Sequence, residues 1–285
     1  MELKKERWNE SLKKVKPEIK NLYYKGNIDL LLDESPKLAI VGSRRMTEYG
    51  ARVIEKWMPL LVDRGVTIVS GFMYGVDQAA HRACIENGGK TIAVLGWGID
   101  WPVASQDEEL YQKILEVNSL PAGKAGLIVS EYEKAMVPEL WMFPQRNRIV
   151  AGISDAVLVV EGAVRSGSLI TAKLATQFGK KLLAVPGQVT SRVAEGTNGL
   201  IRDGKAKAVT CAEDILKEMG LLPGQLKLKI EDIDDPMLSL LADGERSVDE
   251  LSRLLKINVS QVLGKLTELT LCGMVTEAGG KYRLD

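Results

Sequence analysis

The sequence of 285 residues predicts an α/β protein with a doubly wound, mostly parallel sheet and a small C-terminal domain. Two observations support this prediction. Short apolar runs alternate with helix-length segments between residues 37 and 222, and continuous apolar strands are typical of parallel sheets covered on both faces. From residue 237 onward the pattern changes to three short amphipathic segments followed by a hairpin.

Six strands are expected in the main domain. They are KLAIVG (37–42), VTIVSG (66–71), TIAVLG (91–96), GLIVS (126–130), DAVLVVE (155–161) and KKLLAVPG (180–187). Apolar residues three and four apart predict a helix over 47–64, which Pro59 is expected to kink, and further helices over 76–89 and 169–178.

The predicted organisation has four parts. Residues 1–36 form a short basic N-terminal segment, to which no function is assigned, and residues 37–222 form the main domain. Residues 223–236 contain two prolines and an acidic run, which is typical of a linker. Residues 237–285 show helix, helix, helix and hairpin, which is the layout of a winged helix.

Composition bounds the kinds of function. The amino terminus has no apolar signal region and no run of 18 apolar residues occurs, so we expect a cytoplasmic protein without a membrane span. The chain has one histidine, His81, and three widely separated cysteines, Cys84, Cys211 and Cys272. A zinc site or Cys-His catalysis would lack partners, and we expect His81 to be a structural hydrogen-bonding residue.

Formal net charge is zero, but the charges are segregated. Residues 142–210 contain ten basic and four acidic residues, whereas residues 231–285 contain six basic and eleven acidic ones. A basic surface on the main domain suits a polyanion, and the acidic tail is expected to have a different partner.

Small residues and arginines gather at the ends of three predicted strands. Glycine admits a bulky anion, serine adds a hydroxyl donor, and a helix amino terminus supplies free N–H groups. Because the carboxyl ends of parallel strands meet at one edge, we expect a binding site for an extended polyanion there. The predicted residues are Gly42, Ser43, Arg44, Arg45, Ser70, Gly71, Ser166, Gly167 and Ser168, with Arg146, Asn147 and Arg148 beside them.

Structural alternatives remain open for these residues. Each small-residue loop alone is equally typical of a tight strand-to-helix turn, and either arginine of the Arg-Asn-Arg piece suits an ion pair with Glu131 or Glu161.

Cofactor-binding motifs do not fit. The loop GSRRMTEYG lacks the G-x-G-x-x-G pattern, and GAVRSGS has Ser168 where a phosphate loop needs lysine. We therefore expect no cofactor and no catalytic residues.

Several of these pieces resemble the DNA-processing protein A family (DprA or Smf). They are AIVGSRRMTEYG, IVSGFMYGVDQAAH, GGKTIAVLGWGID, FPQRNRIVAGISDAVLVVEGAVRSGSLITA, LLAVPG and GTNGLIRDGKAKAV, in consistent order between residues 23 and 218. The resemblance implies an extended Rossmann-like domain that binds single-stranded DNA, forms a homodimer, protects incoming DNA and helps to load a RecA-type recombinase in natural transformation and recombination. It also implies that Arg44 and the three glycine- and serine-containing loops contact the DNA backbone, while Arg146, Asn147 and Arg148 shape the groove.

The sequence departs from the family pattern at two cations. Tyr74 and Val103 stand where basic residues are usual. An aromatic residue at such a position can stack on bases, and simple packing is an equally common role for it. The helical domain common at the amino terminus of the family is also not expected, because only about 36 residues precede the sheet.

The sequence also bears on two other functions. A nucleotide phosphoribohydrolase of the lysine-decarboxylase-like type needs a glutamate where this chain has Thr171, so the general acid-base role is vacant. Release of free base from nucleoside monophosphates would favour this alternative. DNA binding by the winged helix is disfavoured by its acidic charge, and we expect a protein contact or a regulatory role for it.

Overall fold

The computed structural model describes residues 1–116, 126–221, 236–242, 244–271 and 275–284. The chain divides into two compact units, Met1–Met219 and Gly220–Asp285. The predicted linker lies outside the described residues except for its last position, and Cys272 also lies outside them. None of the helices in the described ranges combines the length and apolar character needed to cross a bilayer.

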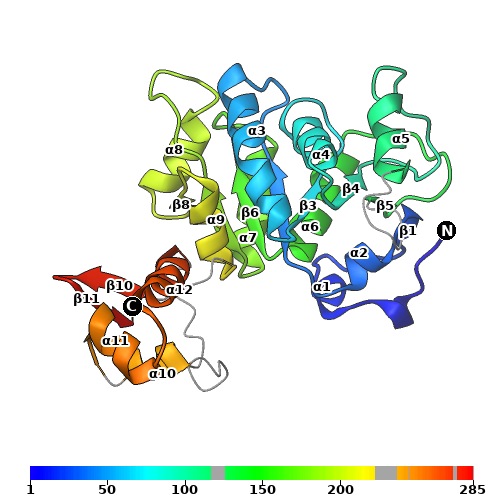
Figure 1. Ribbon diagram of the computed structural model, residues 1–285. Helices are drawn as coiled ribbons and strands as arrows, with labels where there is room; N and C mark the ends of the chain where they lie inside the picture. The colour runs from blue at the N-terminus through cyan, green and yellow to red at the C-terminus, as the bar shows by residue number, and fades with distance from the viewer. Residues whose placement is uncertain (117–125, 222–235, 243, 272–274, 285) are drawn as a thin grey trace. The chain divides into compact units, whose positions relative to one another are not determined.

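An eight-stranded sheet forms the centre of the first unit (Figure 1). Its order is β1-β5-β4-β3-β2-β6-β7-β8, and only β1 runs antiparallel, against β5. The strands are β1 (Tyr23–Gly26), β2 (Lys37–Val41), β3 (Thr67–Ser70), β4 (Thr91–Leu95), β5 (Gly126–Ser130), β6 (Ala156–Val159), β7 (Lys181–Ala184) and β8 (Lys207–Ala208). Strands β2 to β7 are the six predicted ones, so the expected α/β, Rossmann-like class is confirmed.

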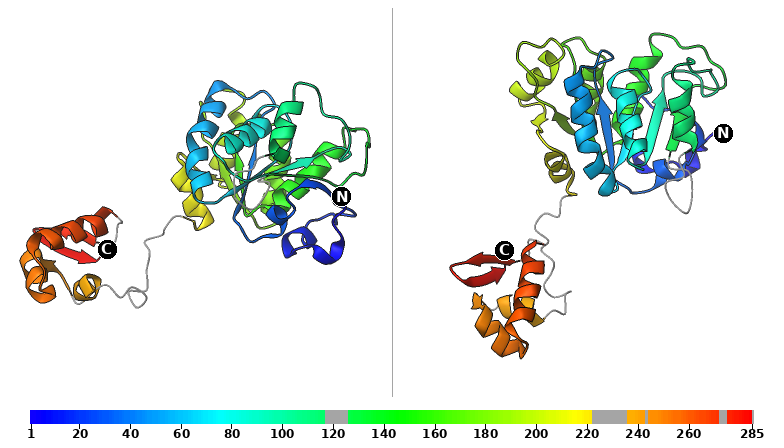
Figure 2. Two further views of the ribbon diagram at one scale, coloured as in Figure 1. Left: turned by 45° about the vertical axis from the view of Figure 1, so that its right-hand side comes forward. Right: turned by 45° about the horizontal axis from the view of Figure 1, so that its top comes forward.

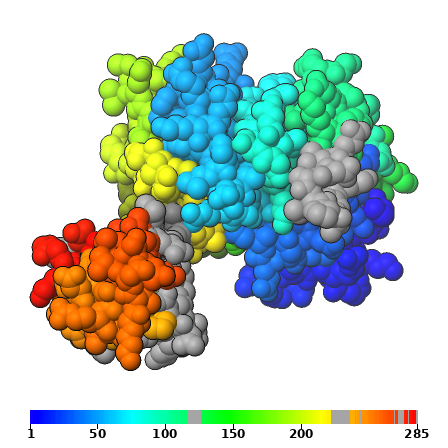
Figure 3. Space-filling view, in the orientation of Figure 1, coloured from blue at the N-terminus to red at the C-terminus, as the bar shows by residue number. Residues whose placement is uncertain are grey.

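Helices cover both faces of this sheet. Figure 1 shows α3 and α4 in front and α6 and α7 behind, and the right-hand view of Figure 2 shows α3, α4 and α5 side by side. In Figure 3 the side chains of α3 and α4 hide the strands beneath them. The helices of this unit are α1 (Glu10–Lys13), α2 (Asp29–Leu32), α3 (Glu48–Asp63), α4 (Val76–Glu86), α5 (Glu108–Glu116), α6 (Met142–Ile153), α7 (Ser168–Gln177), α8 (Glu195–Arg202) and α9 (Ala212–Met219), preceded by the 3₁₀ turn η1 (Lys5–Arg7). Coverage on both sides explains why every residue of β2, β3, β4 and β5 is buried.

The first 36 residues contribute to the core of this unit. Trp8, Leu12 and Ile19 are buried in the same apolar cluster as residues of β2, β4 and β6. β1 adds an antiparallel edge strand, with Tyr24 opposite Val129. The basic residues of this segment alternate with apolar anchors, so its charge alone was a poor guide to its place in the fold.

The second unit has its own small core. Helices α10 (Pro236–Ala242), α11 (Val248–Leu255) and α12 (Val259–Leu271) pack with a three-stranded antiparallel sheet of β9 (Arg246–Ser247), β10 (Val275–Ala278) and β11 (Lys281–Leu284). Ser247 and Glu250 form a capping box at the start of α11. The order of three helices and a hairpin agrees with expectation, and the assignment as a winged helix stays a prediction.

The strand order reverses between β2 and β6. From β2 the chain adds β3, β4 and β5 on one side, then returns to place β6, β7 and β8 on the other. The connections that leave β2 and β6 therefore lead to helices on opposite faces, α3 and α7 (Figure 1). Such a switch point leaves a crevice at the carboxyl ends of the two strands.

His81, on α4, is fully buried near this edge. Its Nε2 lies 2.7 Å from the carbonyl oxygen of Gly71, and its Nδ1 lies 2.7 Å from the hydroxyl of Thr91. Because a carbonyl only accepts, Nε2 carries the proton. In the neutral ring Nδ1 then accepts the one hydroxyl proton of Thr91, which in this state is not donated to the Ile68 carbonyl 3.0 Å away. Burial lowers the pKa of His81 to about 4. The expected structural role of this histidine is confirmed.

This geometry predicts an acid-dependent loss of stability. The unfolded chain binds a proton at His81 below about pH 6.5, whereas the folded chain does so only near pH 4, so stability falls as the pH falls through that window. The contribution of His81 to the loss between pH 7.5 and pH 5.0 should be about 2 kcal/mol, measured by urea unfolding. His81→Gln should be less stable at both pH values and should lose less between them. Since the chain has one histidine, its NMR titration is unambiguous, and a midpoint near 6.5 would contradict the assignment.

Candidate nucleic-acid interface

A groove of about 750 Å³ opens at the carboxyl ends of β2, β3 and β6. We call it the arginine groove. These three strands are neighbours in the sheet, so loops distant in the sequence meet here. Of the twelve predicted residues, ten line it: Gly42, Ser43, Arg44, Arg45, Gly71, Arg146, Asn147, Ser166, Gly167 and Ser168.

The loop after β2 presents Arg44 to solvent. The Arg44 guanidinium lies over the Phe143 ring, with 5.6 Å to the ring centroid, which orients the side chain without neutralising it. Backbone contacts fix the loop: the Val76 N–H donates to the Ser43 carbonyl at 3.2 Å. Gly75 has a φ of +81°, and a side chain there would overlap the same carbonyl, so only glycine fits this approach.

The Ser-Gly-Ser loop begins helix α7. The hydroxyls of Ser166 and Ser168 lie 2.8 Å apart, and the Ser168 N–H donates to the Ser166 hydroxyl at 3.3 Å. Because Gly167 and Ser168 at the start of α7 line the groove, the positive end of the α7 dipole faces it. Asn147 donates to the Gly167 carbonyl at 3.4 Å, so the Arg-Asn-Arg and Ser-Gly-Ser pieces adjoin each other.

Arg146 supplies a buried positive charge beneath the groove. The residue is 4% exposed, and its guanidinium donates to the Val94 carbonyl at the end of β4. A side chain at Gly71 would overlap both the Arg146 guanidinium and the Asp77 carboxylate, so glycine is needed where these groups pass. Burial raises the pKa of Asp77, and the Arg146 guanidinium opposes that rise. The acid is thus held in its charged form less firmly than an exposed aspartate.

Arg148 and Ser70 lie outside the groove. Arg148 is 2% exposed and donates to Glu131 at 2.6 Å, which is the ion pair left open by the sequence. Successive residues on a helix are about 100° apart, so Arg146 and Arg148 leave α6 in nearly opposite directions. Ser70 donates to the Ile40 carbonyl at 2.6 Å and braces β3 against β2. The alternative pairing with Glu161 is not seen, because Glu161 accepts from Thr47.

Sequence reasoning missed several groove residues. Arg165 and Arg192 line the groove and are exposed, and Phe143 and Asp77 line it as well. Arg165 precedes the Ser-Gly-Ser loop directly, so its position was a usable signal. Arg192 follows β7, the next strand beyond β6, and only the sheet order brings it close.

The two departures from the family pattern differ in their surroundings. Tyr74 is 53% exposed in the loop between β3 and α4. Val103 is partly buried and packs against an apolar cluster that includes Phe72 and Ile99. Tyr74 is therefore exposed but is not among the residues that line the arginine groove, and Val103 belongs to the packing of the fold.

Comparison with known proteins gives a family match that covers the first compact unit, Met1–Met219. The family model for DNA recombination-mediator protein A matches residues 1–220. The chain belongs to this family. DNA processing protein DprA of Streptococcus pneumoniae is 42% identical over 197 residues, covering 69% of this chain and 66% of the relative. Protein Smf of Escherichia coli is 36% identical over 273 residues, covering 92% of this chain and 70% of the relative.

Solved structures of this family share the fold. DNA processing protein A of Streptococcus pneumoniae superposes with a TM-score of 0.67 at 39% identity, over 74% of this chain and 71% of that one. DNA processing protein A of Helicobacter pylori, described for its single-stranded DNA binding mode, gives 0.67 at 29% identity, over 77% and 94%. This chain spans 66% of the Streptococcus pneumoniae relative and 64% of a Synechocystis Smf protein.

Arg148 is predicted to act on stability rather than on binding. Arg148→Met leaves Glu131, whose side chain is 8% exposed, without its partner and should cost about 3–5 kcal/mol in urea unfolding. The double variant Glu131→Gln with Arg148→Met removes the orphaned charge and should recover part of that loss. A single-variant loss below about 1 kcal/mol would contradict a stabilising ion pair.

Proposed function

We propose that this chain binds single-stranded DNA along the arginine groove, protects it and presents it to a RecA-type recombinase. The supporting observation is a set of exposed arginines at the groove that form no ion pair within the described part of the chain. Arg44, Arg45, Arg165 and Arg192 line the groove, and none forms an ion pair with another described residue. Unpaired cations around one groove favour a ligand that carries several negative charges.

The shape of the site favours a flexible strand. The phosphate-binding features are a loop, a buried guanidinium and a helix amino terminus at adjoining strand ends, and they face a groove open to solvent. A single strand can bend its backbone into such a groove, whereas sequence reading of a duplex usually places a helix or ribbon in the major groove. Phe143 lines the groove with the Arg44 guanidinium over its ring, and bases stack on aromatic rings.

The family supports the same proposal. The Helicobacter pylori relative is described for a single-stranded DNA binding mode, and its fold covers most of this chain. Loading of a RecA-type recombinase, a homodimeric state, a cytoplasmic location and a role in natural transformation follow from the family resemblance and belong to the proposal. The acidic second unit is proposed as a protein contact or a regulatory element rather than as the DNA site.

The enzymatic alternative has little support in the groove. Thr171, at the position where a phosphoribohydrolase needs its glutamate, is 2% exposed and lines the groove with a hydroxyl instead of a carboxylate. A hydroxyl of ordinary pKa cannot serve as the general acid-base group near neutral pH. We therefore favour a binding protein without catalytic residues.

Strand selectivity tests the proposal directly. Electrophoretic shifts with single-stranded and double-stranded oligonucleotides of equal length should show tighter binding of the single strand at physiological salt. Equal affinity for the two forms would count heavily against the groove as the site of binding.

Removal of Arg44 should weaken binding without unfolding. Arg44→Ala should lower affinity for all single-stranded sequences about tenfold, as expected for one charge-assisted contact. The slope of log K against log salt should fall by about 0.7, the value for one phosphate on a single strand. Salt-titrated fluorescence anisotropy measures both quantities, and thermal melting should be unchanged.

A matched control is Arg202→Ala. Arg202 is exposed on α8, pairs with Asp203 and does not line the groove. Its removal changes the net charge by the same amount and should leave the salt slope nearly unchanged. A destabilised Arg44→Ala protein with an unchanged salt slope would remove Arg44 from the site.

A further inference from the structure

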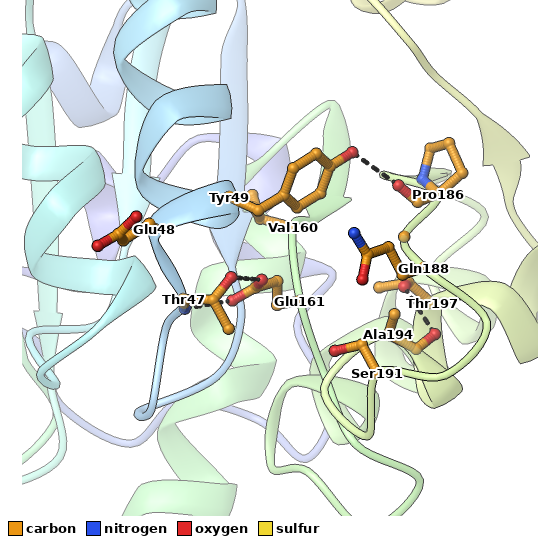
Figure 4. Close-up of a pocket in the computed structure, with 11 residues that line it drawn as sticks. Thr47, Glu48, Tyr49, Val160, Glu161, Pro186, Gln188, Ser191, Ala194 and Thr197 are labelled. Atoms are coloured by element: carbon orange, nitrogen blue, oxygen red, sulfur yellow. Dashed lines mark hydrogen bonds between the residues drawn. The ribbon is translucent and has the colours of Figure 1, made fainter.

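The loop that carries Arg44 is anchored at both ends. On one side the Val76 N–H donates to the Ser43 carbonyl at 3.2 Å. On the other side the backbone N–H and the hydroxyl of Thr47 donate to Glu161 at 2.9 and 2.5 Å (Figure 4). These bonds fix the backbone of the loop, but the direction of the Arg44 guanidinium depends on contacts of its side chain.

Phe143 provides the contact that directs this guanidinium. The Arg44 guanidinium lies 5.6 Å from the Phe143 ring centroid, and it forms no hydrogen bond or ion pair within the described part of the chain. Burial lowers the pKa of Arg146 against the opposing charge of Asp77, and the nearby charge of Arg44 lowers it further. The two guanidinium groups repel each other, so the attraction of the ring face offsets a force that would move Arg44 away.

Phe143 is itself confined by the two residues that follow β4. Gly96 passes so close to Phe143 that a side chain at Gly96 would lie 3.0 Å from the ring, which is tighter than ordinary packing. The Trp97 and Phe143 ring centroids are 6.1 Å apart, with an interplanar angle of 59°. Aromatic rings at this spacing attract each other. Because Phe143 is only partly buried, Gly96 and Trp97 limit the positions that its ring can take.

Trp97 is held firmly enough to support Phe143. The Ser130 hydroxyl donates to the Trp97 carbonyl at 2.5 Å, and the Gly98 N–H donates to the Met136 carbonyl at 3.0 Å. A side chain at Gly98 would overlap the backbone of Met136. The Trp97 side chain packs against the apolar cluster that includes Phe72. Its Nε1 has no hydrogen-bond partner among the described residues, so packing sets the position of the ring.

We propose that Trp97 is a positioning residue for DNA binding, which acts through Phe143 on the direction of Arg44. Trp97 is not among the residues that line the arginine groove, whereas Phe143 and Arg44 both line it. The Trp97 ring supports Phe143, Phe143 supports the guanidinium, and the guanidinium meets a phosphate. The inference rests on the proposed binding of single-stranded DNA in the arginine groove and adds a residue outside that groove.

Substitution of Trp97 tests the first link. The probe is a fluorescent fifteen-residue oligothymidine, and salt-titrated anisotropy gives its affinity. Trp97→Leu keeps an apolar side chain without a ring and should weaken binding about fivefold, the effect of losing one aromatic pair. The slope of log K against log salt should fall toward that of Arg44→Ala. Trp97→Phe keeps a ring and loses no hydrogen bond to a described residue, so affinity and slope should stay near the wild-type values.

Phe143→Leu tests the second link and completes a cycle with Trp97→Leu. The single variant should lower the salt slope, because Arg44 loses the ring beneath it. If Trp97 acts through Phe143, the double variant should bind as weakly as Phe143→Leu alone. Phe143 is partly buried at the groove, so its substitution stays informative even if Trp97→Leu does not fold.

Trp101→Leu is the matched control. Trp101 lies in the same segment after β4, is also partly buried and is not among the residues that line the groove. The same substitution there should leave the affinity within about twofold and the salt slope unchanged. Thermal melting measures the stability of both variants.

The outcomes separate this inference from the proposed function. Absence of oligothymidine binding by the wild-type protein overturns both. Weaker binding by Arg44→Ala together with unchanged binding by folded Trp97→Leu overturns the inference alone. Additive losses in the double variant, an unchanged salt slope in Phe143→Leu or an equal loss in Trp101→Leu also overturn it. A lower salt slope in Trp97→Leu, its recovery in Trp97→Phe and no further loss in the double variant support it.

Discussion

The reversal of strand order between β2 and β6 is the constraint on which the site depends. Because the chain leaves these two strands toward opposite faces, no connection crosses the crevice between their ends. The backbone groups, helix terminus and side chains at this edge must then find partners in one another or face solvent. Arg146 meets this condition by reaching the Val94 carbonyl under the edge, and Gly71 leaves the space for it. The arginine groove is the space that remains.

Most of the main sheet was predictable because its strands are short, continuous and apolar. Coverage on both faces makes each strand a continuous apolar run, which its short length and the small residues at its end distinguish from a helix. The amino-terminal strand β1 was missed because Tyr23–Gly26 includes a lysine and a glycine and follows a basic segment. Its pairing with β5 is a long-range contact, and nothing local in the sequence encodes it.

The site residues in loops that directly follow strands were predictable from the sequence. Those on a helix, Arg146 and Arg148 of α6, were less so. The sequence predicts the Arg-Asn-Arg piece as one part of the site, yet α6 turns Arg146 toward the groove and Arg148 toward Glu131. Helical periodicity of residues 142–153 would have separated the two arginines, but the segment is apolar on most sides and has little amphipathic pattern. The positions of Arg192 and Glu161 near the site could not be predicted from the sequence, for another reason. Their roles depend on which strands are neighbours in the sheet.

The contact between Gly75 and the Ser43 carbonyl has a consequence for how such a protein can vary. The shape of the loop after β2 is set by backbone groups, while the side chain of Arg44 projects from it and takes no part in holding it. Changes at the projecting positions alter charge and leave the frame intact, whereas a change at Gly75 would disturb the frame itself. Tyr74, next to Gly75, is 53% exposed and is likewise a projecting position. Affinity and stability thus depend on different residues of two adjoining loops, so a change in surface charge at Arg44 need not alter the stability of the fold.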